Sequence, residues 1–301
     1  MTERGLIAKS YFAGCHPAVN LIYFVLVIGM TMFSTDPFFL AATLLFSWIY
    51  SVLLMGKKAV KLNLLFTVPM LTVMALVNTL FTHNGATLLF KLNGQRITLE
   101  ALLYGIAGAV LLIAVIIWFS CFNVAMSSEK LIYIFGRATP VLGLTLSMVF
   151  RFIPLLKKRF KEITMGQRCM GRHVEGGLLK RIRQIGKEVS ILVSWSLEAS
   201  IETADSMEGR GYGLPGRTSF HLYKMAREDW LMAGWFLLTG GISIVGCAMG
   251  KTSIYYFPRL VLRQWDAFTV ITMVAYAALM ATPIILDILE EKKWQSFNLE
   301  T

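Results

Sequence analysis

The sequence contains little charge for its length. Asp, Glu, Lys and Arg make up 16% of its 301 residues, whereas soluble globular domains have about 25%. Hydrophobic residues make up 56%, and the mean hydropathy is +0.62. A composition this apolar excludes an ordinary soluble domain and is typical of the membrane class.

Charge is missing altogether from six long blocks of the sequence. A membrane-spanning helix needs about 20 mostly apolar residues to cross about 30 Å of hydrocarbon. Each block is close to this length, so we expect an all-α integral membrane protein with about six transmembrane helices. A further inserted helix near residues 131–156 is left open. The blocks are Pro17–Thr35, Phe38–Met55, Leu62–Phe81, Ala101–Val124, Trp230–Gly250 and Ala267–Leu286.

The sequence also lacks the patterns that carry catalysis or bind metals. Its four cysteines form no C-x-x-C pair, and it has no G-x-S-x-G or H-E-x-x-H motif. The six blocks contain none of the ionisable residues that transporters and proton pumps usually keep inside the membrane. We therefore expect a protein that is not an enzyme, uses no metal or cofactor, and does not drive transport alone.

The charge that is present is mostly positive and unevenly placed. The net charge is +11, and Lys and Arg gather at 57–61, 126–228 and 292–293. Because cytoplasmic loops carry such an excess, we expect both termini to be cytoplasmic. The chain then divides into four spans in 1–125, a cytoplasmic region in 126–228 and two spans in 229–301. Acidic residues are interleaved with the basic ones, so contact with the lipid bilayer explains this surface better than nucleic acid.

The loop between the third and fourth blocks predicts a small β-hairpin outside the cell. Two short alternating runs flank Asn93-Gly94. Asn-Gly between such runs is a strong hairpin signal, because both central residues of the turn need positive φ.

The cytoplasmic region predicts two amphipathic helices. An apolar run over 131–156 is expected to break at a proline, and a charged helix then runs from Lys157 to about Met170. A second helix is expected from about Lys187 to Gly209, with Gly211 as the left-handed residue that ends it. The apolar stripe of this second helix consists of Val193, Leu197, Ile201 and Ala204.

Both helices end in a cluster of Gly and Arg, in 166–172 and 209–217. A basic surface that contacts lipid is one interpretation of these clusters. The other is a docking plug, in which a helix ending in Arg enters a groove on a cytoplasmic partner and the guanidinium makes forked hydrogen bonds.

The segment around the second cluster resembles a known family. Residues 204–213, A-D-S-M-E-G-R-G-Y-G, with Arg217-Thr218 following, are similar to the second coupling motif of the T component of energy-coupling factor (ECF) transporters, the EcfT/CbiQ-like family. That motif commonly reads A-D-A-M-E-A-R-G-Y. Upstream, R-F-I-P at 151–154 resembles the family's R-F-(I/L)-P element.

Residues 163–171, I-T-M-G-Q-R-C-M-G, resemble the family's first coupling motif, I-x-x-A-Q-x-x-R-G. This sequence departs from the motif at two positions: Gly166 replaces Ala, and Met170 replaces Arg. Arg168 and Arg172 are the neighbouring arginines that would substitute.

The resemblance implies a scaffold subunit of an importer for vitamins or metal ions in a bacterial or archaeal cell membrane. Its partners would be two ABC-type ATPase subunits and a membrane substrate-binding S component. The residues expected to couple to the ATPases are Gly209, Arg210, Gly211, Gly166, Gln167, Arg168, Gly171 and Arg172. The residues expected to have structural roles in the motifs are Arg151, Pro154, Ala204, Asp205 and Glu208.

Two alternatives belong to other functional classes. A lipid-modifying membrane enzyme would need a nucleophile, a metal or an acid–base pair at the interface, and the sequence shows none. A conventional ABC permease subunit would normally couple through one main helix, whereas this chain has two Gly–Arg helices.

Overall fold

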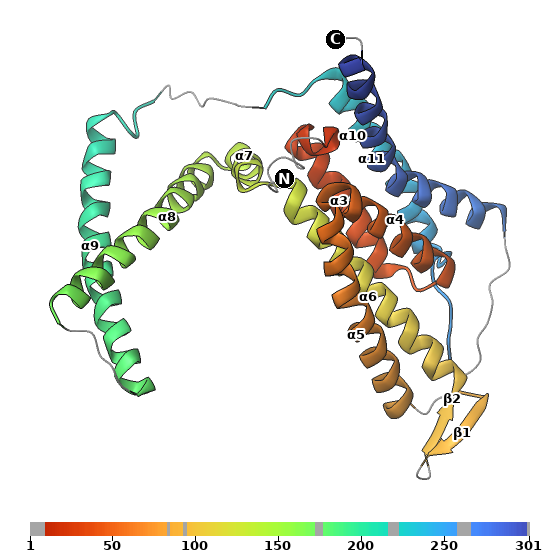
Figure 1. Ribbon diagram of the computed structural model, residues 1–301. Coiled ribbons are helices and arrows are strands. Elements are labelled where there is room, and N and C mark those ends of the chain that lie inside the picture. The colour runs from red at the N-terminus through yellow and green to blue at the C-terminus, as the bar shows by residue number, and fades with distance from the viewer. Residues whose placement is uncertain are drawn as a thin grey trace. The chain divides into compact units, whose positions relative to one another are not determined.

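The computed structural model of the protein describes residues 10–82, 85–92, 95–171, 177–215, 223–257 and 266–299. The chain divides into two compact units. We call Met1–Leu131 with Tyr223–Thr301 the membrane unit, and Ile132–Leu222 the inserted unit. The elements, labelled in Figure 1, are α2 (Tyr11–Gly14), α3 (Pro17–Phe33), α4 (Pro37–Met55), α5 (Lys57–Phe81), β1 (Leu88–Leu92), β2 (Gln95–Thr98), α6 (Leu99–Ala125), α7 (Ser128–Ala138), α8 (Pro140–Cys169), α9 (Leu178–Gly209), α10 (Arg227–Ala248) and α11 (Ala267–Leu299).

Each of the six apolar blocks forms a helix of the membrane unit. Five helices, within α4, α5, α6, α10 and α11, have the length and composition needed to cross a membrane. The sixth, α3, is a mostly apolar helix of 17 residues, which makes it about 25 Å long. The predicted class, an all-α integral membrane protein, is confirmed.

Local signals at the helix ends explain where the first helices begin. The side chain of Asp36 accepts a hydrogen bond from Phe38 N at 2.9 Å, and Pro37 stands at the first position of α4. A side-chain acceptor before the helix and Pro at its start are both favourable, because the first backbone N–H groups have no partner within the helix. Gly56, with φ of 64°, makes the tight turn from α4 into α5.

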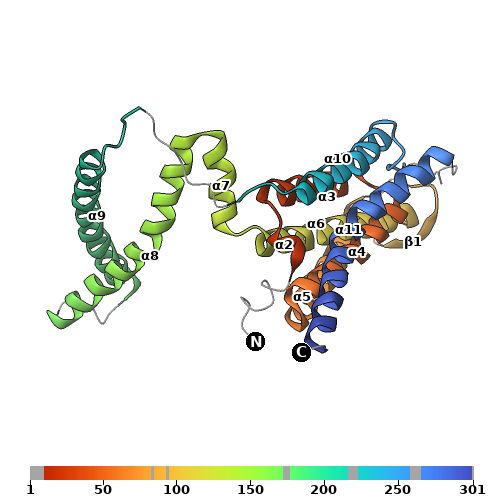
Figure 2. The same ribbon diagram turned by 90° about the horizontal axis from the view of Figure 1, so that it is seen from above.

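Large aromatic side chains fill the core of the membrane unit. Tyr23 of α3 is fully buried and makes edge contacts with Phe12 and Trp118, at ring centroid distances of 5.1 and 6.1 Å. Deeper polar groups pair with each other: Tyr276 Oη of α11 lies 2.7 Å from Thr43 Oγ1 of α4. Such pairing is required where no water is available. Figure 2 shows α3 lying against α10, with α6 and α11 alongside.

The predicted β-hairpin is present between α5 and α6. Strands β1 and β2 are antiparallel, with Lys91 opposite Arg96 and Leu92 opposite Gln95, and the register shifts between Leu88 and Phe90. The Asn93-Gly94 turn itself lies outside the described residues. The hairpin leads directly into α6, where Glu100 accepts a hydrogen bond from Thr87 N at 3.1 Å (Figure 1).

The inserted unit differs from the sequence prediction in two places. Helix α8 runs unbroken through Pro154, so the expectation that a separate charged helix starts at Lys157 is wrong. The break falls at Pro140, which occupies the first turn of α8, where its missing N–H costs nothing. Helix α9 begins at Leu178, well before Lys187, but ends at Gly209 as predicted.

A matched pair of glycine substitutions in α10 tests the packing of the membrane unit. A Cβ on Gly246 would lie 2.3 Å from Cγ2 of Thr272 on α11, whereas a Cβ on Gly241 would meet nothing within 4 Å. We expect Gly246→Ala to lower the stability of the detergent-purified protein by about 1–3 kcal/mol through overpacking. Gly241→Ala should be neutral or slightly stabilising, because Ala favours a helix. Thermal unfolding of both variants measures this, and equal midpoints would contradict the close α10–α11 contact.

Candidate functional site: two capped helix ends

Helix α9 ends in a glycine cap that displays an arginine. Arg210 is the C-cap residue, and Gly211 follows with φ of 79°. Tyr212 N donates to Met207 O at 3.0 Å, and Gly211 N donates to Glu208 O at 2.9 Å. These are the two hydrogen bonds of a Schellman motif, which satisfies the last carbonyls of a helix. The predicted left-handed role of Gly211 is confirmed.

Helix α8 ends in the same way. Met170 is the C-cap residue, and Gly171 follows with φ of 68° and donates to Arg168 O at 3.0 Å. Met170 therefore occupies the position in α8 that Arg210 occupies in α9. Arg168 lies two residues earlier, in the last turn. Arg172, like Arg217 and Thr218, lies outside the described residues.

The two ends present their side chains to the surroundings. Arg168, Met170 and Arg210 are exposed, and so are Ala204, Asp205 and Glu208, while Gln167 is half-buried. The C-terminal end of a helix carries a partial negative charge, so a cation is favoured there. An exposed guanidinium at such an end offers five N–H donors in a fixed plane.

Glycine at two motif positions is not required by packing. A Cβ on Gly166 or Gly209 would meet nothing within 4 Å. The alanines that stand at these positions in the motifs resembled by this sequence would therefore fit without rearrangement. Gly171 and Gly211 differ, because positive φ strains any residue with a Cβ.

Polar contacts hold α8 and α9 together in an antiparallel pair. Glu188 is buried on α9 and accepts hydrogen bonds from Thr164 Oγ1 at 2.8 Å and Gln184 Nε2 at 3.1 Å. The guanidinium of Arg159 lies 4.9 Å from the ring centroid of Trp195. Antiparallel packing places the two capped ends at opposite ends of the pair, and α9 with 32 residues is about 48 Å long. Sequence reasoning missed Glu188, because it reads like any surface charge on a charged helix.

A hollow of about 750 Å³ lies between α8 and α9 beside the Arg210 end. Arg151 and Ser147 line it from α8, and Glu202, Ser206 and Arg210 line it from α9. The structure thus brings together Arg151 and Arg210, which come from separate motifs of the sequence. Pro154 lies on the exposed side of α8 rather than at a break.

The predicted apolar stripe of α9 does not pack against α8. Val193, Leu197 and Ile201 are 51%, 63% and 64% exposed. Helix α9 meets α8 through Trp195, Ala199 and Thr203 instead, which line the shared hollow. The inserted unit therefore leaves a wide apolar face uncovered.

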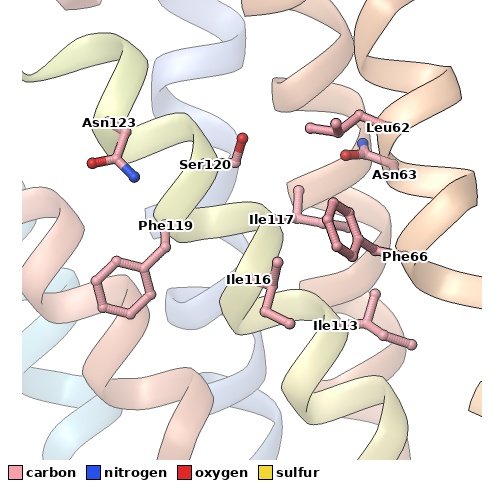
Figure 3. A pocket seen from close by; sticks show the side chains of 9 residues that line it. All are labelled: Leu62, Asn63, Phe66, Ile113, Ile116, Ile117, Phe119, Ser120 and Asn123. Atoms are coloured by element: carbon pink, nitrogen blue, oxygen red, sulfur yellow. The ribbon is translucent and has the colours of Figure 1, made fainter. Parts of the chain in front are cut away.

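A second hollow, of about 320 Å³, opens between α5 and α6 of the membrane unit. Figure 3 shows Phe66 of α5 lying beside Ile113 and Ile117 of α6. The polar groups in its wall are the uncharged side chains of Asn63, Ser120 and Asn123. Within the described ranges, no group of three or more His, Cys, Asp or Glu side chains is placed to hold a metal ion.

These features define an integral membrane protein that carries two exposed helix ends with matching glycine caps. The chain belongs to the CbiQ family, because the family model described as "Cobalt transport protein" matches residues 9–222. The resemblance to EcfT/CbiQ-like transmembrane components of ECF transporters is thereby confirmed.

Curated relatives carry the name "Energy-coupling factor transporter transmembrane protein EcfT". The relative from Staphylococcus aureus is 24% identical over 75% of this chain and 89% of its own length. The relative from Lactobacillus helveticus is 31% identical over 38% of this chain, and the match spans 43% of that protein. The relative from Lactococcus lactis subsp. cremoris is 37% identical over 30% of this chain and 35% of its own length.

The cap of α9 can be tested with two glycine variants that lie two residues apart. Gly211→Ala should cost about 1–2 kcal/mol locally, because Ala resists the left-handed conformation. Gly209→Ala should leave the end of α9 unchanged or firmer. Hydrogen–deuterium exchange at the amides of Gly211 and Tyr212 measures the cap directly. Unchanged exchange in Gly211→Ala would show that these amides are not held by the cap.

Proposed function

We propose that this chain is the transmembrane scaffold of an ECF-type importer. In this role it relays ATP hydrolysis by two cytoplasmic ABC-type ATPase subunits to a membrane substrate-binding S component. The chain itself would catalyse nothing. The observation that carries the proposal is the pair of exposed helix ends with matching glycine caps, one of which presents Arg210.

The two capped helix ends match the number of ATPase subunits. The capped ends lie at opposite ends of an antiparallel helix pair, so each can meet a different subunit. Arg210, with Gly209 and Gly211, would enter a groove on one ATPase. Gly166, Gln167, Arg168, Gly171 and Arg172 would form the corresponding contact on the other. Arg151, Pro154, Ala204, Asp205 and Glu208 would support these ends.

The uncovered apolar face of the inserted unit supports docking of an S component. Val193, Leu197 and Ile201 of α9 are exposed, as are Val149 and Ile153 of α8. Apolar patches this large on a folded surface mark interaction sites. A membrane subunit with an apolar exterior would cover such a face without exposing it to water.

The membrane arrangement that fits this role has both termini in the cytoplasm of a bacterial or archaeal cell. It has four spans in 1–125, a cytoplasmic coupling region in 126–228 and two spans in 229–301. The basic surface of the coupling region would then lie near anionic lipid and the ATPases, with no part in nucleic-acid binding. The cargo would be a vitamin or a metal ion chosen by the S component, and the family description, cobalt transport, agrees with the second class.

Charge reversal at Arg210 tests the docking role. We expect Arg210→Glu to remain in the membrane but to co-purify with at least about tenfold less ATPase, because reversing a docking charge costs several kcal/mol. Lys187→Glu, the same charge change on an exposed side chain in the middle of α9, is the matched control. Quantified co-purification from detergent measures both. Full ATPase recovery with Arg210→Glu would remove Arg210 from the interface.

The two caps carry different residues, Arg210 and Met170, and we expect these residues to contribute unequally to ATPase binding. Arg210→Ala removes a guanidinium, whereas Met170→Ala removes only an apolar side chain from the equivalent position. We therefore expect Arg210→Ala to weaken ATPase association more, by about 1.5–3 kcal/mol for lost charged hydrogen bonds. Titration of purified ATPase onto the two variants in nanodiscs gives the affinities. Equal losses would contradict a larger contribution of Arg210 than of Met170 to ATPase binding.

A further inference from the structure

A short segment at the start of the described chain, Ser10–His16, is partly buried within the membrane unit, with Gly14 exposed. Phe12 and His16 are 0% and 3% exposed. The segment contains only one short helix, α2, so its backbone groups need partners outside this helix. Some of these partners lie within the segment, as Ser10 O does for Gly14 N, but others come from positions far away in the sequence.

Two buried carboxylates hold the backbone of this segment. Asp287 of α11 accepts hydrogen bonds from Phe12 N at 3.0 Å and from Ser10 Oγ at 2.9 Å. Asp229 of α10 accepts from His16 N at 3.2 Å. Each carboxylate is 8% exposed, so each of these is a charge-assisted hydrogen bond with little competition from water.

A buried lysine holds the segment from the other side. Lys130, at the start of α7, is 7% exposed. Its ammonium donates to Ala13 O, to Ala125 O at 3.1 Å, and to the side-chain oxygen of Asn20 at 3.1 Å. With the Asn20 amide oriented so that its oxygen faces Lys130, its nitrogen donates to Phe12 O at 2.9 Å. The three N–H donors of the ammonium therefore each have an oxygen acceptor. These hydrogen bonds offset part of the cost of burying the charge, and the same burial lowers the pKa of Lys130.

Some partners of the segment stand close to the two places where the chain crosses between units. The chain leaves the membrane unit after Leu131, one residue beyond Lys130, and returns to it at Tyr223. At the return, Asp229 also accepts from Ala226 N at 2.9 Å, and Glu228 accepts from Tyr11 Oη at 2.9 Å. One partly buried segment thus binds both the exit and the return of the chain.

We propose that Ser10–His16 acts as a clasp. It fixes the two places where the chain enters and leaves the inserted unit, which we call the roots of this unit. Lys130 and Asp229 are the positioning residues of the clasp. This inference rests on the proposed function: force from the ATPases reaches the inserted unit and must not be lost at its attachments. With both roots bound to one segment, the inserted unit moves against a fixed base. Loosened roots would let ATPase movement dissipate in bending of the chain.

The test uses the full chain co-purified with its ATPases and reconstituted in nanodiscs. Nitroxide labels are placed at Lys187→Cys, an exposed position of α9 outside both capped ends, and at Glu291→Cys on the exposed side of α11, in a Cys169→Ser, Cys247→Ser background. Pulsed electron paramagnetic resonance then measures the distance between labels with ATP and with ADP. The positioning variants are Lys130→Met and Asp229→Asn, and Lys224→Met, an exposed lysine in the returning segment, is the control.

We expect the unaltered chain and Lys224→Met to show a nucleotide-dependent shift in distance. Lys130→Met and Asp229→Asn should retain bound ATPases and ATP hydrolysis but show broadened distances with the shift lost. A full shift in both positioning variants would overturn the clasp while leaving the proposed function intact. If the complex of the unaltered chain with its ATPases hydrolyses ATP with no shift, the relay and the clasp both fail.

If the variants do not fold, hydrogen exchange on the unaltered complex tests the proposal instead. A fixed clasp requires that the amides of Phe12 and His16 stay protected from hydrogen exchange with either nucleotide bound. Faster exchange of either amide in one nucleotide state would overturn the proposal.

Discussion

Inside a bilayer, every backbone N–H and C=O must find its partner within the chain, because hydrocarbon offers none. This constraint accounts for the membrane unit, whose apolar blocks all become helices. Some buried side chains pair in the same way: Tyr276 meets Thr43 between helices, and Asn63 donates to Ser51 at 3.1 Å. Three buried charges of this unit bind backbone groups that have no partner within a helix: Lys130 and Asp229 near the starts of α7 and α10, and Asp287 within α11.

The inserted unit differs from the membrane unit, because few contacts join its helices and apolar side chains remain exposed. Helices α8 and α9 are held by a few polar contacts, chiefly those of Glu188 and Arg159, and leave apolar residues such as Leu197 and Ile201 uncovered. An isolated soluble domain would bury such residues. The uncovered surface and the two capped ends together describe a unit whose remaining contacts are made by other proteins.

Features that depend on neighbours in the sequence were well predicted. The six helical blocks, the hairpin around Asn93-Gly94 and the left-handed Gly211 all follow from local composition or turn geometry. Predictions that required knowing the helix partners failed. A separate charged helix was expected to start at Lys157, yet a 30-residue helix that begins at Pro140 continues through this position. The apolar stripe on α9 followed from its spacing, but the sequence did not show that the stripe stays exposed and that Trp195 and Glu188 make contacts with α8.

The sequence by itself determined the protein class, the positions of the helices and the two Gly–Arg ends, because hydropathy, glycine caps and short motifs act over a few residues. Only the tertiary structure decided that Met170 and Arg210 occupy equivalent caps and that Arg151 lies beside Arg210. It alone joined Phe12 to Asp287, which are 275 residues apart, and Ala13 to Lys130, which are 117 apart. A buried carboxylate or ammonium reveals its charge in the sequence but not its acceptors or donors, since these are chosen by the packing of distant helices.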